Sequence, residues 1–364
     1  MKVAVLGVGL IGGSIGLAAR RRLAADVAGF DVEAENLARA SKLGAIDHSC
    51  GSVEEAVDGA ELIFCAAPVS VLPELVRAAL AGSGPDALVT DVGSTKRDLL
   101  GSLAGEPGAE RFIGGHPLAG TEAAGVTGAR ADLFEGARWY LTPTESSSGV
   151  VYDRLQRAIA ELGARPQAID AEVHDRLMAT VSHLPHVLAN VLVAEAAEAL
   201  SKESERLPAV GPSFRDTTRV AGANPAIWGD ILAANSGSVA DGIDRLVERL
   251  NAAAAVLRGG DRGQIAEWHA DAAETRRGLL ESELVGGPLR ELQIAVENRP
   301  GTVAEIALAL GSVGVNIEDM ALAPAADMQT GSISLWVAGD DEAERGAQVV
   351  RELGYTVTLS EAAE

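Results

Sequence analysis

Short apolar runs alternate with amphipathic stretches along the first 143 residues of the chain. The β-branched run at 2–8 is followed by a helical pattern that ends near Leu23, and this order then recurs. Further strands are predicted at 27–31, 61–68, 87–93, 111–117 and 137–143. Because strands alternate with helices, we expect a parallel sheet covered by helices on both faces.

From residue 150 onward the apolar positions follow a helical period instead. One predicted helix face carries Val151, Leu155, Ile159 and Leu162. A long helical stretch is expected over 171–201, with Pro185 inside it as a kink. After a loop at 204–214, two more helical stretches are predicted over 225–258 and 261–284. The middle of the chain therefore reads as an all-helical domain.

A third pattern follows the linker at 286–289. Strand, helix, strand, strand, helix and strand are predicted at 290–297, 302–312, 315–323, 331–339, 341–353 and 355–360. This order is typical of a ferredoxin-like sandwich. We therefore expect three domains, at residues 1–149, 150–285 and 289–364.

Composition narrows the class of protein. The chain has 364 residues, of which 47% are hydrophobic, so it can bury large cores. Its net charge of −22 disfavours a nucleic-acid partner. Two cysteines form no disulfide framework. The apolar N-terminal run is unlike a signal peptide, since glycines break it and three arginines end it, and we expect no stretch long and apolar enough to span a bilayer. We expect a cytoplasmic protein.

The first predicted strand leads into a G-x-G-x-x-G sequence formed by Gly7, Gly9 and Gly12, with Leu10 and Ile11 between the last two. Such glycines allow a tight turn and let a pyrophosphate approach the start of the following helix. We interpret this as a Rossmann-type dinucleotide site and include Pro68, at the end of a later strand, in it. The alternative is a glycine-rich turn in another α/β protein.

Asp31 ends the second predicted strand, about 20 residues after the glycines. A carboxylate there accepts hydrogen bonds from the adenosine ribose and repels a 2′-phosphate, which favours NAD over NADP. An ordinary turn aspartate is the alternative.

Ser94 and His116 follow later strands, so their loops should reach the same crevice at the carboxyl ends of the sheet. A neutral imidazole near NAD suits the removal of a hydroxyl proton as hydride leaves the same carbon. The alternatives are a helix N-cap for Ser94 and a loop histidine bonded to backbone for His116.

The helical middle segment carries two further polar groups. His183 and His186 lie three residues apart, but no matching Cys/His pair accompanies them, so we expect a polar cluster at the cleft and no metal. Arg215 and Arg219 lie four apart, ahead of Trp228, and their guanidinium groups could grip carboxylates from one helix face. The alternatives are a solvated helix face and a surface salt-bridge helix.

Taken in order, the segments GVGLIGGSIG, GFD, DVGSTK, GGHPLAGTE, SHLPH and FRDTTRVA…NPAIW resemble the prephenate dehydrogenase family. The resemblance covers essentially the whole chain. The C-terminal unit resembles an ACT domain through NRPG at 298–301 and GVNI at 314–317.

The resemblance implies NAD-dependent oxidation and decarboxylation of prephenate to 4-hydroxyphenylpyruvate, a step in tyrosine biosynthesis. It implies that His116 takes the ring-hydroxyl proton, that Ser94 fixes the hydroxyl or His116, and that Arg219 clamps a carboxylate. The residues that would complete the substrate pocket are Thr121, Ser182, His186, Arg215 and Trp228. Relatives differ in whether they take prephenate or its aminated analogue arogenate, so arogenate or dual specificity is the alternative.

The resemblance also implies a homodimer formed through the helical domain and an amino-acid effector on the ACT unit. We expect the effector to be L-tyrosine, held near Asn298, Pro300, Gly301, Asn316 and Ile317. Two other classes remain open at this point: a different Rossmann dehydrogenase, such as a β-hydroxyacid dehydrogenase, and a non-catalytic sensor of NAD and an amino acid.

Overall fold

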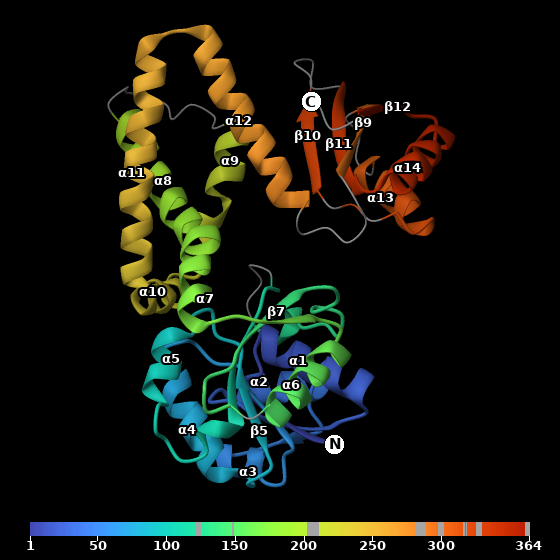
Figure 1. Cartoon of the computed structure of the whole chain (residues 1–364). Coiled ribbons are helices and arrows are strands. Elements are labelled where there is room, and N and C mark those ends of the chain that lie inside the picture. The colour runs from blue at the N-terminus through green and yellow to red at the C-terminus, as the bar shows by residue number, and fades with distance from the viewer. Residues whose placement is uncertain are drawn as a thin grey trace. The chain divides into compact units, whose positions relative to one another are not determined.

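The computed structural model describes residues 1–120, 125–147, 149–201, 211–281, 289–297, 302–315, 317, 319–324 and 330–360. The chain divides into two compact units, Met1–Arg249 and Leu250–Glu364, and each is described by itself (Figure 1).

An eight-stranded sheet organises the first unit, in the order β3-β2-β1-β4-β5-β6-β7-β8. The strands are β1 (Lys2–Leu6), β2 (Asp26–Phe30), β3 (His48–Ser49), β4 (Leu62–Cys65), β5 (Leu88–Asp91), β6 (Phe112–Pro117), β7 (Arg138–Thr142) and β8 (Arg165–Ala168). The first six run parallel, as predicted. The edge differs from the prediction, because β7 is antiparallel to β6, and the short strands β3 and β8 were not predicted.

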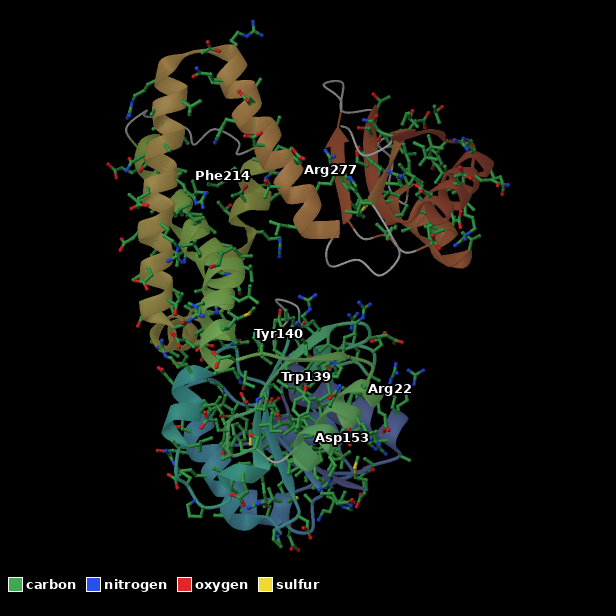
Figure 2. All side chains as sticks on the ribbon, viewed as in Figure 1. Arg22, Trp139, Tyr140, Asp153, Phe214 and Arg277 are labelled. Atoms are coloured by element: carbon green, nitrogen blue, oxygen red, sulfur yellow. The ribbon has the colours of Figure 1, made fainter. Side chains whose placement is uncertain are left out.

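Alternating side chains of the strands build a core on each face of the sheet. In β1, Val3 and Val5 face one cluster, whereas Ala4 and Leu6 face the other. The first cluster includes side chains of α1 (Leu10–Leu23), α2 (Ala34–Leu43) and α6 (Gly149–Glu161). The second includes side chains of α3 (Val53–Val57), α4 (Leu72–Gly82) and α5 (Arg97–Ser102). Helices therefore cover both faces, and β7, the strand next to the edge strand β8, carries Trp139 and Tyr140 (Figure 2).

The all-helical segment begins later than expected. We predicted it from residue 150, but α6 packs on the sheet and β8 extends it. The helical elements are α7 (Ala171–Met178), the π-helical turn η3 (Ala179–His183), α8 (Leu184–Ser201), α9 (Pro212–Thr218), the short 3₁₀ turn η4 (Arg219–Gly222), α10 (Pro225–Ala234) and α11 (Ser236–Gly259). The π turn directly precedes Pro185, which has no backbone N–H to continue the regular helical pattern.

One expectation about this segment was wrong. By length and composition alone, the run Ala171–Ala199 is long and apolar enough to cross a membrane, and 22% of its most apolar 18 residues are buried within the structure. However, three polar side chains in the run, His174, Asp175 and His183, are buried within the protein. These three side chains belong to the site described below, so this run contributes buried polar groups to the folded protein.

The second unit holds the end of α11, helix α12 (Arg262–Glu281) and a small sheet. Its remaining elements are β9 (Leu289–Glu297), α13 (Thr302–Ser312), β10 (Asp319–Pro324), β11 (Thr330–Ala338), α14 (Asp340–Glu352) and β12 (Thr356–Ser360). The sheet is antiparallel, in the order β10-β11-β9-β12. Ile294 pairs in register with Ile333 on one side and Val357 on the other, and all three lie in the core.

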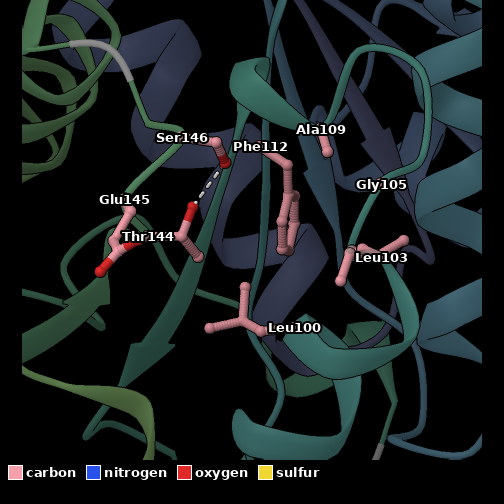
Figure 3. A pocket seen from close by; sticks show the side chains of 9 residues that line it. Leu100, Leu103, Gly105, Ala109, Phe112, Thr144, Glu145 and Ser146 are labelled. Carbon is pink, nitrogen blue, oxygen red and sulfur yellow. Dashed lines mark hydrogen bonds between the residues drawn. The ribbon is translucent and has the colours of Figure 1, made fainter.

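A pocket of about 370 Å³ lies beside α5 on the sheet unit (Figure 3). Its lining is mostly apolar and includes Leu100, Leu103 and Phe112, with Thr144 and Ser146 at one side. The described residues that line this pocket include none of the predicted site residues, so the candidate site lies elsewhere.

Candidate active site

The glycine-rich turn after β1 has the tight geometry that lets a bound phosphate group approach the start of a helix. Gly7 has a φ of +98°, and a Cβ there would lie 2.2 Å from the Ala66 carbonyl oxygen. A Cβ on Gly12 would lie 1.9 Å from the Gly7 carbonyl oxygen, so both positions require glycine. Gly9 has open space around it and caps α1 without a side-chain hydrogen bond. The three glycines thus close the turn and leave the start of α1 open to an anion.

Asp31 lies next to this turn, at the end of β2. Its carboxylate accepts hydrogen bonds from the Val8 and Glu33 backbone N–H groups, each at 2.9 Å, and from the Asn36 amide at 3.1 Å. The carboxylate is therefore fixed beside the glycine turn while the side chain is only partly buried. Pro68 is exposed in the loop after β4, the strand that neighbours β1 on the side opposite β2.

A buried ion pair anchors the loop after β5. The Lys96 ammonium contacts the Asp91 carboxylate and donates a 2.7 Å hydrogen bond to the Gly115 carbonyl oxygen. Asp91 in turn accepts from the Gly93 and Gly115 backbone N–H groups at 2.8 and 2.9 Å. Burial lowers the pKa of Lys96, and Asp91 opposes this shift. The loop that carries Ser94 is thus tied to the strand that carries His116.

The two glycines before His116 are required by this packing. A Cβ on Gly114 would lie 2.4 Å from the Thr142 hydroxyl oxygen, and one on Gly115 would lie 2.5 Å from the Asp91 carbonyl oxygen. Only glycine therefore lets β6 approach its neighbours closely enough to place the following imidazole at the carboxyl end of the sheet.

His116 contacts a second histidine from the helical segment. His116 Nδ1 lies 2.9 Å from His174 Nε2, and His174 Nδ1 lies 2.8 Å from Asp175 Oδ1. Burial lowers the pKa of His116 well below its ordinary value, and the charges of His174, Lys96 and His183 lower it further. At neutral pH the ring therefore carries no net charge and can accept a proton.

Further polar groups of the helices surround this cluster. The rings of His186 and Trp228 stack with centroids 3.3 Å apart, and His183 meets the same indole edge-on at 6.0 Å. His186 Nδ1 donates to the Ser182 carbonyl oxygen at 3.1 Å. Burial lowers the pKa of His183 to about 4 and lowers that of His186. Both imidazoles are therefore uncharged at neutral pH.

The remaining predicted residues stand as follows. Ser94 is partly buried in the loop after β5 and is not the N-cap of α5, which is Lys96. Arg215 lies in α9 and Arg219 begins η4, so they do not share one regular helix, and both side chains are exposed. Thr121, Asn298, Pro300, Gly301 and Asn316 lie outside the described residues, and Ile317 packs against the core of the second unit.

The sequence analysis missed three residues of the cluster, His174, Asp175 and Asn235. The Asn235 amide donates to the Asp175 carbonyl oxygen at 2.7 Å and approaches His183 Nδ1 at 3.2 Å. One signal was present: the chain has only six histidines, and His174 lies close to the His183–His186 pair in the same helical stretch. No group of three metal-ligating side chains is found within the described ranges.

The strand order 3-2-1-4-5-6, the glycine turn after β1 and the carboxylate after β2 define an NAD-binding Rossmann domain. Family models match the prephenate dehydrogenase nucleotide-binding domain over residues 15–167 and the prephenate dehydrogenase dimerization domain over residues 170–271. The prephenate dehydrogenase of Bacillus subtilis is 30% identical, over 96% of this chain and 95% of that protein. The chain belongs to the prephenate dehydrogenase family.

Solved structures similar to this chain include dehydrogenases of prephenate and of arogenate. The prephenate dehydrogenase from A. aeolicus in complex with hydroxyphenyl propionate and NAD+ is 29% identical, with a TM-score of 0.72 over 77% of this chain and 98% of its own. The Synechocystis arogenate dehydrogenase is 26% identical, with a TM-score of 0.65 over 77% of this chain and 100% of its own.

Proposed function

We propose that this enzyme oxidises prephenate with NAD and releases CO2, giving 4-hydroxyphenylpyruvate in tyrosine biosynthesis. The observation that carries the proposal is His116, an uncharged imidazole held by buried partners at the carboxyl end of the sheet, within a chain of this family. NAD, when bound, accepts the hydride.

His116 takes the proton of the ring hydroxyl while the hydride on the same carbon is transferred to the cofactor, so that this carbon becomes a carbonyl. The bond to the ring carboxylate then breaks as CO2 leaves, and its electron pair enters the ring. The phenolic oxygen regains a proton, which the His116 imidazolium can return. Because aromatisation drives this sequence, the protein mainly orients the ring and accepts a proton at the right moment.

The other predicted residues take supporting roles in the proposal. Ser94 hydrogen-bonds the ring hydroxyl, and Arg219 binds a substrate carboxylate, with Arg215 as the alternative clamp. The pocket is completed by Thr121, Ser182, His186 and Trp228. The stacking of His186 on Trp228 supports the assignment of these two rings to one wall.

NAD is assigned to the turn after β1. Gly7, Gly9 and Gly12 admit the pyrophosphate at the start of α1, flanked by Leu10 and Ile11, and Asp31 binds the ribose hydroxyls. The open space at Gly9 and the fixed Asp31 carboxylate support this assignment. Pro68 is assigned to the same cofactor site.

Assembly and control are also part of the proposal. The helical segment forms a homodimer interface, which the match to a dimerization domain supports. The C-terminal unit is a ferredoxin-like ACT domain that binds tyrosine, which its β-α-β-β-α-β order and its sheet order support. We propose a soluble cytoplasmic enzyme, consistent with the net charge of −22.

The experiment that tests the activity compares purified prephenate and arogenate side by side, with NADH formation followed by absorbance. We expect NADH with prephenate and much less with arogenate. If only arogenate gave NADH, the enzyme would be an arogenate dehydrogenase. If neither substrate gave NADH, the proposed activity would be contradicted. A panel of 2- and 3-hydroxy acids with NAD serves as the control for a different dehydrogenase.

A further inference from the structure

A chain of three side chains ends at the proposed base. It runs from His116 Nδ1 to His174 Nε2 over 2.9 Å and from His174 Nδ1 to Asp175 Oδ1 over 2.8 Å. His174 and Asp175 are 0% and 1% exposed, whereas His116 is only partly buried. The two inner members are thus shielded from water, and only the outer ring is accessible.

The protons along this chain can be assigned from the inner end. Burial alone would raise the pKa of Asp175, but hydrogen bonds from His174 and from the Arg97 and Lys96 backbone N–H groups outweigh it, so the pKa lies below its ordinary value. Asp175 is therefore an anion and can only accept hydrogen bonds. His174 must then carry a proton on Nδ1, and in the arrangement proposed here its Nε2 is the acceptor toward His116.

The same logic extends to His116. Since His174 Nε2 accepts, His116 Nδ1 must donate, and the lone pair of His116 then lies on Nε2. We propose that His174 and Asp175 are positioning residues that hold His116 in this tautomer and orientation. The inference rests on the proposed function, in which His116 Nε2 is the atom that takes the hydroxyl proton.

The chain also bears on the charge that proton uptake creates. When the hydroxyl O–H bond breaks, its proton binds Nε2, and His116 becomes an imidazolium that still donates from Nδ1 to His174. The Asp175 anion lies two hydrogen bonds away and offsets that charge. Among the described residues, the other charged or titratable groups around the two rings include Asp91 at the end of β5, Lys96 in the loop after it, His183 on η3 and Tyr140 on β7.

Neighbouring contacts fix the middle ring. The Tyr140 ring meets His174 edge-on at 5.7 Å, and the Asn235 amide holds the backbone oxygen of Asp175 at 2.7 Å. Asp175 also accepts from the Lys96 and Arg97 backbone N–H groups at 2.8 and 2.9 Å. A change at Asp175 would therefore disturb the start of α5 as well, so His174 is the better site for a test.

The first test reads the tautomer of the unmodified full-length enzyme by long-range ¹H–¹⁵N NMR with labelled histidine, near neutral pH. His116→Asn identifies the His116 signals by their loss. We expect a protonated Nδ1 and an unprotonated Nε2 on His116. The opposite tautomer would overturn the inference. This readout needs no substrate, so its failure is distinguishable from failure of the proposed function.

The second test is a double-mutant cycle with His174→Phe, which keeps a ring and removes both hydrogen bonds. We expect kcat to fall about 10- to 100-fold, a loss of the size seen when a residue that orients a metal-binding histidine is replaced. The KM values for substrate and NAD should change little. Because His174 acts through His116, the double variant His116→Asn/His174→Phe should be no slower than His116→Asn alone. His48→Phe, the same substitution at an exposed histidine paired with Asp26, is the matched control and should retain activity.

Two results would overturn the positioning role. One is a kcat for His174→Phe close to that of the unmodified enzyme. The other is a double variant whose losses multiply, since that would mean His174 acts independently of His116. Thermal unfolding of each variant checks folding, and if the Phe variant does not fold, the tautomer measurement on the unmodified enzyme decides.

Discussion

His116 owes its chemistry to its surroundings. Burial and the nearby charges of His174, Lys96 and His183 lower its pKa well below the ordinary value, so the ring is unprotonated at neutral pH. As pH falls through this lowered pKa, the ring gains a proton and can no longer act as a base. We therefore expect any acid limb in kcat that reports His116 to lie below pH 6.5, the ordinary pKa of histidine.

Replacing His116 tests its role directly. His116→Asn keeps a similar size, but its amide cannot take the hydroxyl proton, so we expect turnover to fall by roughly 100- to 10,000-fold. Steady-state kinetics with prephenate and NAD should show little change in either KM. The control is His48→Asn, since His48 is an exposed histidine paired with Asp26 far along the sheet. Near-normal turnover of the His116 variant would remove the proposed base.

Arg219 is the proposed carboxylate clamp. A charge-assisted hydrogen bond to a carboxylate contributes about 1.5–3 kcal/mol, less where water screens it, so Arg219→Ala should raise the substrate KM by up to about 100-fold. NAD binding should be unaffected, and Arg219→Lys should recover part of the loss, because an ammonium cannot make the forked contact. If Arg215→Ala impairs prephenate binding and Arg219→Ala does not, the clamp is Arg215.

At this scale the sequence indicated the outer residues of the site but not the inner ones. Gly7, Asp31 and His116 each follow a recognisable strand, and their place at one sheet edge follows from parallel topology. His174 and Asp175 come 58 and 59 positions after His116, at the start of a helix whose docking no periodicity reveals. A contact between side chains far apart in the sequence, such as that between His116 and His174, forms only when the helix packs on the sheet, so the local pattern of apolar residues does not predict it.

At the scale of elements, apolar periodicity located five of the six parallel strands, all except the short β3, and the order of the C-terminal unit. It failed at β8, because the segment Arg165–Ala168 is short and mostly polar and is a strand only through pairing with β7. It also joined α10 to α11, which separate at Asn235, a buried residue bonded to Asp175. In both cases a tertiary contact overrode the local pattern.

The close approach of β6 to β5 gives a prediction about stability. A Cβ on Gly115 would lie within 3 Å of the Asp91 carbonyl oxygen, the Thr90 hydroxyl and the Trp139 indole nitrogen. Gly115→Ala should therefore lower the free energy of unfolding by about 1–3 kcal/mol, measured by urea denaturation. Gly101→Ala in α5, where a Cβ meets open space, is the control and should be neutral or slightly stabilising. Equal stability of the two variants would contradict this packing argument.

For the whole molecule, the exposed apolar side chains of α8 bear on assembly. Val191, Leu192 and Val193 are 57%, 40% and 40% exposed and point to different sides of the helix, and apolar side chains exposed in this number on one helix indicate that a partner covers part of it. We expect light scattering at micromolar concentration to give the mass of a dimer. Val191→Glu should weaken the dimer by placing a charge in the interface, whereas Val150→Glu, at an exposed position of α6, should not. A monomer mass for the unmodified chain would count against the homodimer.

The last prediction concerns control by the C-terminal unit. If L-tyrosine binds there and favours a less active conformation, it should inhibit the full-length enzyme, with a coupling free energy of about 1–3 kcal/mol. A chain ending at residue 286 should keep its activity and lose this sensitivity. Such a chain is expected to fold, because it keeps both segments that the family models match, residues 15–167 and 170–271. Tyrosine also resembles the product and can compete for the substrate pocket, so inhibition is measured at several prephenate concentrations in both chains. Competitive inhibition of equal strength in the two would place tyrosine at the active site and leave the C-terminal unit without a regulatory role.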